Sequence, residues 1–261
     1  MTQQGKHSPG HGPRVSLFVT CLADLFRPSV AWAAIELLEQ AGCTVDVPTA
    51  QSCCGQPAYN AGEYDTARPL ARQVIELLEP ADYVVLPSGS CAGMLIHHYP
   101  RLLEGDWHDR AVALAAKTFE LTTFLSEIAP LPAGEGSATT AVAYHDSCAG
   151  LRELGIREQP RELLRQRCDV EVLELTQRDV CCGFGGTFCA KMPDIAAKMS
   201  DDKLKDALEK GARVLTGGDL GCLLTLAGRA SRMGHELEVR HVAELLVGDS
   251  ETPAIGEGEP G

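Results

Sequence analysis

The sequence predicts an α/β fold made of two pseudo-symmetric repeats, each a small parallel sheet with flanking helices. Short apolar runs typical of strands alternate with longer helix-like segments, which indicates βαβ units. The alternation starts again after a stretch rich in Pro, Gly and Ser at 130–138. Cysteines recur at offsets of 127, 128 and 131 residues, from Cys21 to Cys148, from Cys53-Cys54 to Cys181-Cys182, and from Cys91 to Cys222.

The elements follow in the same order in both units. In the first unit, apolar runs predict strands at 15–20, 44–47 and 83–86, and helices are expected at 30–38, at 66–78 and before Leu121. The segment from Glu120 to Phe124 is interpreted as the last strand of this unit and is matched to Glu238-Val-Arg-His-Val242. In the second unit, strands are expected at 141–144, 170–175, 214–216 and 237–240, and helices at 161–167, 195–208 and 223–230.

Domain boundaries follow from this repetition. A first cysteine-rich domain is predicted at 14–129, a linker at 130–138 and a second cysteine-rich domain at 139–248. The tail at 249–261 offers little apolar surface to bury and is expected to be disordered.

Composition limits the classes of partner and the compartment. The net charge of −13 disfavours nucleic acid and anionic membranes as partners. No apolar run reaches the length of a membrane span, and the polar N-terminus is not a secretory signal, so a cytoplasmic location is expected. In that reducing compartment the 11 cysteines are better explained by metal or redox chemistry than by disulfides.

Each unit places four cysteines after its strands, where the carboxyl ends of parallel strands form a binding crevice. The expected ligands are Cys21, Cys53, Cys54 and Cys91 in the first unit and Cys148, Cys181, Cys182 and Cys222 in the second. Four thiolates hold either zinc or an iron–sulfur cluster. Structural zinc sites usually draw on Cys-x-x-Cys knuckles, and this sequence contains none. Two iron–sulfur clusters are therefore expected, with a non-redox, zinc-stabilised interaction module as the alternative.

The remaining candidates are given smaller roles. Cys43 and Cys168 each open a Cys-x-Val-x-Val run and are interpreted as small buried hydrophobes. Cys189, in the glycine-rich loop after Cys182, and His145, three residues before Cys148, are candidates for an extra ligand or for hydrogen bonding to a cluster. His241 is interpreted as a packing residue, and the pair His97-His98 as surface residues.

Several motifs together carry a family resemblance: Gln51-Ser-Cys-Cys-Gly-Gln-Pro57, Pro87-Ser-Gly-Ser-Cys-Ala-Gly93, Tyr144-His-Asp-Ser-Cys148 and Cys181-Cys-Gly-Phe-Gly-Gly-Thr-Phe188. The chain resembles the cysteine-rich CCG-domain iron–sulfur superfamily, which includes the cysteine-rich component of heterodisulfide reductase and the iron–sulfur component of glycolate oxidase. Within that superfamily it is most similar to the lactate utilisation protein A family. The resemblance runs from about residue 15 to 247.

The resemblance implies a function. The chain would be the iron–sulfur electron-transfer component of a cytoplasmic complex that oxidises L-lactate, a small 2-hydroxy acid, to pyruvate. Its partners would be the other subunits of the complex, including a further iron–sulfur protein. The chain would act as an oxidoreductase subunit together with these partners. Thiol–disulfide chemistry of the heterodisulfide reductase kind, or a glycolate-oxidase-like role, is the alternative within the superfamily.

One departure from the superfamily pattern concerns a fifth cysteine. The full pattern ends each domain in Cys-x-x-Cys, but here Ser88 and Asp219 stand three residues before Cys91 and Cys222. Four thiolates suffice for a [4Fe-4S] cubane. Each unit is therefore expected to hold a [4Fe-4S] cluster, or one with an oxygen ligand from Ser88 or Asp219.

Overall fold

The computed structural model describes residues 12–134, 140–168 and 170–257. These residues form two four-stranded parallel sheets, ordered β2-β1-β3-β4 and β6-β5-β7-β8. The first sheet contains β1 (Arg14–Leu17), β2 (Thr44–Asp46), β3 (Tyr83–Leu86) and β4 (Thr118–Glu120). The second contains β5 (Ala141–His145), β6 (Glu171–Leu173), β7 (Val214–Gly217) and β8 (Glu238–His241). The predicted fold of two α/β repeats is confirmed.

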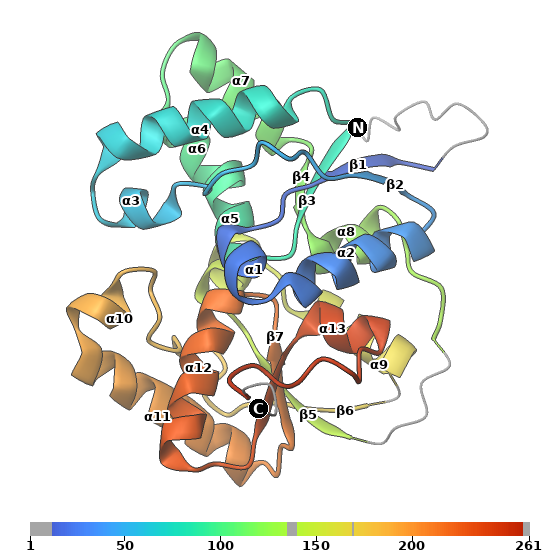
Figure 1. Cartoon of the computed structure of the whole chain (residues 1–261), viewed down its shortest axis with the longest axis vertical. Helices are drawn as coiled ribbons and strands as arrows, with labels where there is room; N and C mark the ends of the chain where they lie inside the picture. Colours follow the sequence, from blue (N-terminus) through green and yellow to red (C-terminus); the bar gives the residue numbers. More distant parts are fainter. Residues whose placement is uncertain (1–11, 135–139, 169, 258–261) are drawn as a thin grey trace.

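Helices connect the strands and cover the sheets (Figure 1). Those of the first unit are α1 (Cys21–Phe26), α2 (Pro28–Gln40), α3 (Gln56–Asn60), α4 (Tyr64–Leu78), α5 (Gly89–Gly93), the π-helix η1 (Met94–His98), α6 (Tyr99–Leu102), α7 (Asp106–Ala115) and α8 (Leu121–Glu127). Those of the second unit are the π-helix η2 (Ala149–Glu153), α9 (Glu158–Cys168), α10 (Phe188–Lys191), α11 (Pro193–Glu209), α12 (Leu220–Met233) and α13 (Val242–Val247).

The two units have the same strand register. Leu17 of β1 pairs with Val85 of β3, and Tyr144 of β5 pairs with Thr216 of β7. Because side chains alternate across a strand, Val15 and Leu17 face one side of the first sheet, toward α2 and α8, while β3 turns other residues toward α4 and α7. The repeat detected in the cysteine spacing is thus a repeat of backbone geometry.

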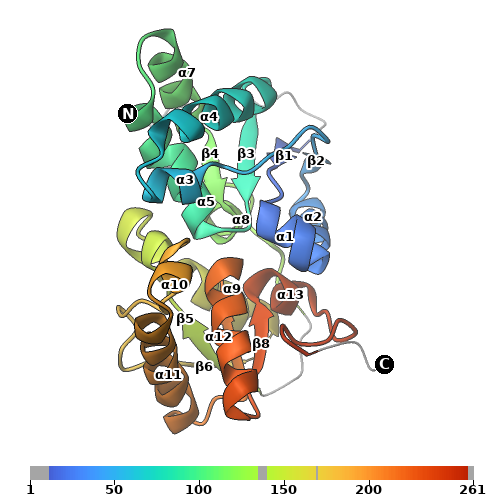
Figure 2. The same ribbon diagram turned by 60° about the vertical axis from the view of Figure 1, so that its left-hand side comes forward.

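The units meet at the carboxyl ends of their strands, which Figure 2 shows directed toward one another. Helix α2 of the first unit packs on α13 of the second, and α8 packs on α9 in the corresponding way. Their apolar faces form one buried core that contains Leu37 and Leu125 from the first unit and Leu164 and Val242 from the second. This shared core fixes the two edges against each other.

The end of the first sheet differs from the prediction. The strand stops at Glu120, and Leu121 to Phe124 lie in helix α8, because the Glu120 carboxylate accepts hydrogen bonds from the backbone N–H groups of Thr122 and Thr123 and caps the helix. The residue equivalent to Glu120 is His241, which caps α13, rather than Glu238. The register predicted for this segment was therefore wrong by three residues.

The segment after α13 also differs from the expectation of disorder. Ala254 and Ile255 are buried, and the Ile255 N–H donates to the Val239 carbonyl oxygen at 2.8 Å. Asp249 accepts hydrogen bonds from the backbone N–H and the hydroxyl of Thr252. Residues up to 257 are ordered against the second unit, whereas 258–261 of the predicted tail, like 135–139 of the predicted linker, lie outside the described residues.

Cys43 and Cys168 lie away from the carboxyl edges of the sheets. Cys43 is buried just before β2, as expected. Cys168 ends α9 rather than opening a strand, and its thiol donates to the Leu245 carbonyl oxygen at 3.2 Å. Within the described residues, no helix has both the length and the apolar character needed to cross a membrane.

Candidate metal centres

The first cysteine set converges from three loops at the carboxyl edge of the first sheet. Cys21 begins α1, Cys53 and Cys54 lie between β2 and α3, and Cys91 lies in α5. The Sγ atoms of Cys21 and Cys53 are 3.9 Å apart, and those of Cys54 and Cys91 are 3.2 Å apart. All four are free thiols. The predicted residues of this set are therefore close neighbours.

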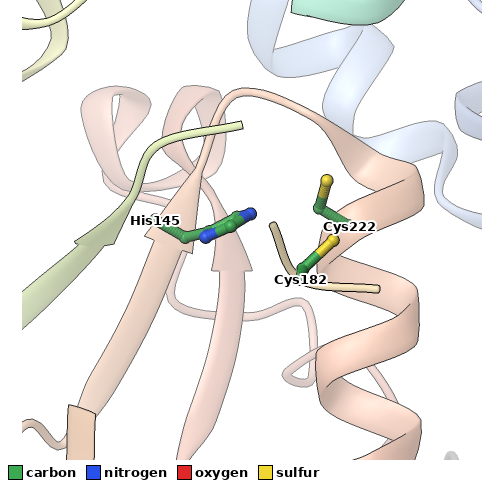
Figure 3. Close-up of side chains that lie close together, drawn as sticks. All are labelled: His145, Cys182 and Cys222. Carbon is green, nitrogen blue, oxygen red and sulfur yellow. The ribbon is translucent and has the colours of Figure 1, made fainter. Parts of the chain in front are cut away.

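The second cysteine set repeats this arrangement. Cys148 precedes η2, Cys181 and Cys182 lie between β6 and α10, and Cys222 lies in α12. Ligand atoms of Cys182, Cys222 and His145 lie within 4.8 Å of one another. Figure 3 shows the His145 ring pointing toward the two sulfur atoms. Cys148 is the exposed member of the set and stands beside Cys181.

The Cys-Cys-Gly turn has the same construction in both units. Gly55 and Gly183 have φ angles of 84° and 95°, which favour glycine. Their N–H groups each donate to the first cysteine of the turn, Cys53 or Cys181, at 3.4 Å. A Cβ atom on Gly183 would stand 2.6 Å from the Ala196 carbonyl oxygen, so that glycine is also required by space. Backbone donors thus approach the sulfur atoms in both units.

Comparison with known proteins assigns the chain to a family. A family model described as a cysteine-rich domain matches residues 15–96 and 142–227. The chain is 45% identical over 238 residues to lactate utilization protein A of Exiguobacterium sp., which covers 90% of this chain and 97% of that protein. It is 43% identical over 235 residues to lactate utilization protein A 2 of Bacillus cereus, with 89% and 97% covered. The chain belongs to the lactate utilization protein A family.

Solved structures add little to that assignment. A putative Asp/Glu racemase from Yersinia pestis superposes with a TM-score of 0.37 at 9% identity, with 90% of this chain and 96% of that chain covered. A likeness of this size carries no argument about the site.

Closely spaced thiols in this family member share protons. Hydrogen bonds from Cys21 and Cys54 lower the pKa of Cys53 to about 2, and Cys148 and Cys182 do the same for Cys181. The hydrogen bond to Cys53 conversely raises the pKa of Cys21, and burial adds to that rise. One thiolate therefore forms easily in each set, while the hydrogen bond to it and burial disfavour deprotonation of a second thiol. A bound cation would remove this opposition, because thiolate rather than thiol is the metal ligand.

The two residues considered as oxygen ligands contact each other. Ser88 and Asp219 are buried, and each stands at the N-terminus of the helix that carries the last cysteine of its set. The Ser88 hydroxyl donates to Asp219 Oδ2 at 3.4 Å, and that oxygen also accepts the N–H of Ser90 at 2.9 Å. Ser88 Oγ accepts from the Cys91 N–H at 3.4 Å. Both side chains are thus engaged in joining the units.

His145 and Cys189 occupy different environments. His145 ends β5 at 1% exposure, and among the described residues neither ring nitrogen has a hydrogen-bond partner. Burial lowers the pKa of His145 to about 3, so the ring is neutral. Cys189 lies in α10, and its thiol donates to the Gly186 carbonyl oxygen at 3.8 Å. His145 is brought to the second set, while Cys189 is directed at its own loop.

Sequence reasoning missed several polar residues that join the units or support the sites. His97 and His98, expected at the surface, reach Glu153 of the other unit at 3.0 and 3.1 Å and are half-buried. Arg161 donates two hydrogen bonds to Asp146, at 2.9 and 2.8 Å, and both side chains are 1% exposed. No residue spacing signals these contacts. The adjacency of Asp146 to His145 was the available hint of its importance.

An apolar groove of about 570 Å³ opens beside the first cysteine set. Its lining includes Cys21 and Cys53 of the first set together with the apolar side chains of Leu25, Trp32 and Ile35. Trp32 and Leu25 are each 71% exposed. The first set is therefore reachable from solvent through a largely apolar opening.

Proposed function

We propose that this chain is an iron–sulfur electron-transfer component of a system that oxidises L-lactate to pyruvate. The observation that carries the proposal is the convergence of four free thiols at the same place in each of two matched units. Membership of the lactate utilization protein A family supports lactate as the substrate. The eleven free cysteines support a reducing compartment, the cytoplasm.

The donor set suits iron–sulfur clusters. Thiolate sulfur is the usual ligand of such clusters, and each site offers four. The ligands would be Cys21, Cys53, Cys54 and Cys91 in one unit and Cys148, Cys181, Cys182 and Cys222 in the other. N–H groups at Gly55 and Gly183 already point at cysteine sulfur, and hydrogen bonds of this kind help to set cluster potentials. Two [4Fe-4S] clusters would be the cofactors.

Lactate oxidation requires either two one-electron acceptors or a single acceptor that takes two electrons. Oxidation of L-lactate to pyruvate releases two electrons and two protons, and an iron–sulfur cluster supplies one-electron transfer when bound. The two cysteine sets lie in units whose helices pack on each other, α2 on α13 and α8 on α9, so two such sites in one chain would meet this requirement. Removal of the substrate's protons and electrons falls to partner subunits, including a further iron–sulfur protein, which would dock where the first set opens to solvent.

A zinc-stabilised interaction module is the second candidate, and one distance favours it. Two thiolates on a tetrahedral zinc ion, each about 2.3 Å from the metal, would stand about 3.8 Å apart. Cys21 and Cys53 Sγ are 3.9 Å apart. The same cysteines would then stabilise the fold without redox chemistry.

Metal analysis on protein purified without oxygen separates the two candidates. About eight irons and eight acid-labile sulfides per chain are expected for two [4Fe-4S] clusters. The Cys54→Ala and Cys182→Ala variants should each lose half of both, whereas Cys43→Ala, a buried cysteine outside the sets, should lose none. Zinc without sulfide would refute the redox proposal.

The substrate is tested separately with the reconstituted partner subunits. L-lactate should reduce the clusters, monitored by electron paramagnetic resonance, and D-lactate is the matched control. Loaded clusters that L-lactate leaves oxidised in the full complex would refute lactate as the electron donor while leaving the cluster assignment intact.

A further inference from the structure

The surroundings of the two cysteine sets differ at equivalent positions. Phe18 stands three residues before Cys21, and His145 stands three residues before Cys148. The register places both at the same point of the sheet, since the preceding residues Leu17 and Tyr144 pair with Val85 and Thr216. Phe18 is fully buried in the apolar cluster that contains Cys54 and Cys91. The second unit therefore has an imidazole where the first has a phenyl ring.

His145 is a buried polar group without a partner. It is 1% exposed, and within the described part of the chain both ring nitrogens lack a hydrogen bond. An unsatisfied buried polar group is destabilising, so such groups usually have a partner in the working protein. The ring points at Cys182 and Cys222, whose sulfur atoms lie within 4.8 Å of its nitrogen (Figure 3). A donor N–H is thus held where the second centre would be.

A second difference lies on the helix behind the Cys-Cys-Gly turn. Gly55 faces Ala67 of α4, and Gly183 faces Ala196 of α11, which aligns the two helices. Seven residues further on, the first unit has Val74, with 0% exposure, and the second has Lys203, with 1% exposure. A buried aliphatic side chain is thus replaced by a buried cation.

Lys203 lies on helix α11, which contacts the second set one turn earlier, where the Ser200 hydroxyl donates to the Cys182 carbonyl oxygen at 2.7 Å. Its ammonium donates to the carbonyl oxygens of Gln177 and Arg178. Burial lowers the pKa of Lys203, while Asp206 and the negative charge of Cys182 and Cys181 oppose that shift. The Asp206 carboxylate accepts the N–H groups of Thr176 and Gln177, so it is shared among several donors. The Lys203 ammonium is therefore held against the segment that leads into Cys181 and Cys182.

We propose that His145 and Lys203 make the second centre the electron-accepting end of the pair. His145 donates a ring N–H to a sulfur of the centre bound at Cys182 and Cys222, and Lys203 adds positive charge nearby. Both interactions favour the reduced form, which carries one more negative charge. Electrons then pass singly from the first centre, which is oxidised, to the second, which is reduced. This inference rests on the proposed function.

Redox titration followed by electron paramagnetic resonance tests the inference on the loaded protein. The two centres are assigned with the Cys54→Ala and Cys182→Ala variants, and the second should have the higher potential. Replacing each residue by its counterpart, in His145→Phe and Lys203→Val, should lower the potential of the second centre alone. Loss of one charge-assisted hydrogen bond predicts about a tenfold to hundredfold change in the redox equilibrium, at 59 mV per tenfold step for one electron.

Two controls guard against a structural explanation. Lys205→Gln removes a charge from the same helix at a side chain that is 72% exposed, and it should leave both potentials unchanged. His145→Asn keeps an N–H donor and should recover part of the shift. Where His145→Phe fails to fold, nitrogen hyperfine spectra of the wild-type protein decide: weak coupling from a histidine at the reduced second centre supports the donor role.

The outcomes that overturn the inference are specific. Equal potentials, an unchanged second centre in Lys203→Val, or no histidine coupling would each refute it. Strong nitrogen coupling would make His145 a ligand and refute the donor assignment. Each of these outcomes is observed on protein that contains iron and sulfide. Protein that lacks iron and sulfide would instead refute the proposed function itself.

Discussion

Ser88 Oγ and Asp219 Oδ2 lie 3.4 Å apart, although the two residues occupy the same position in different units. Each stands three residues before the last cysteine of its set, Cys91 or Cys222. Asp219 Oδ2 also accepts the Ser90 N–H at 2.9 Å. Asp219 therefore ties the loop that carries a ligand of the first set to the helix that carries a ligand of the second. The positions left without a fifth cysteine are where the units are joined.

Removing the Asp219 carboxylate, which belongs to the second unit, should weaken metal binding at the first set. Asp219→Ala leaves the N–H of the half-buried Ser90 without its partner, which should cost about 1–3 kcal/mol of unfolding free energy. Denaturant unfolding without oxygen, together with iron analysis in a Cys182→Ala background, measures both effects. Asp202→Ala, on an exposed side chain paired with Lys198, is the control and should change little. Unaltered stability and full iron in Asp219→Ala would contradict the linking role.

The sequence was sufficient for the fold because the strands are short buried runs and the long helices have a clear apolar face. Val84, Val85 and Leu86 of β3 are fully buried, which makes that strand an uninterrupted apolar run. Helices of four to six residues, such as Cys21–Phe26, are too short for periodicity to detect. The segment after Glu120 was misassigned because a side-chain cap, rather than hydrophobic pattern, starts the helix there.

The site was predictable to the extent that it is repeated. Spacing alone grouped the eight cysteines into two sets, and the structure brings each set together. Contacts between units have no spacing signal, because they depend on which loops of two folded domains face each other. Ser88 with Asp219 and His98 with Glu153 are such contacts. His145 was a candidate from the sequence, whereas Lys203, at the position equivalent to Val74, would have required a comparison of unlike residues at repeated positions.

Burial of Glu120 should make stability depend on pH. Its pKa is raised to about 7, first by burial and then by the nearby Asp219, against the hydrogen bonds from Thr122 and Thr123. The folded state then binds the proton more tightly than the unfolded state, whose ordinary value is 4.5. The stabilisation is therefore full below about 4.5 and is lost as pH rises to about 7.

A neutral isostere isolates this effect. Relative to Glu120→Gln, wild-type unfolding free energy should fall by on the order of 3 kcal/mol between these pH values. Denaturant unfolding at a series of pH values measures the difference, and Glu127→Gln, an exposed change on the same helix, is the control. Parallel curves for wild type and Glu120→Gln would show that the carboxyl group does not titrate in this window.

The turn at Gly183 should not tolerate a side chain. Gly183→Ala must adopt a φ of 95° and place its Cβ 2.6 Å from the Ala196 carbonyl oxygen. A loss of about 1–3 kcal/mol and of the iron at the second set is expected. Gly211→Ala, at a φ of 79° with open space around its Cβ, should cost about 1–2 kcal/mol and keep all iron. Equal iron content in the two variants would contradict the required turn geometry.

Cys189 lies close in sequence to the proposed ligand Cys182 but is not expected to be a ligand itself. It follows Cys182 by seven residues, yet its thiol donates to the Gly186 carbonyl oxygen at 3.8 Å within its own loop. Cys189→Ser keeps a donor for that carbonyl, so iron, sulfide and both redox potentials should match the wild type. Cys181→Ser, at a thiol hydrogen-bonded to Cys148 and Cys182, should instead lose or alter the second centre. A spectrum that changes in Cys189→Ser as it does in Cys181→Ser would add Cys189 to the ligand set and remove the equivalence of the two units.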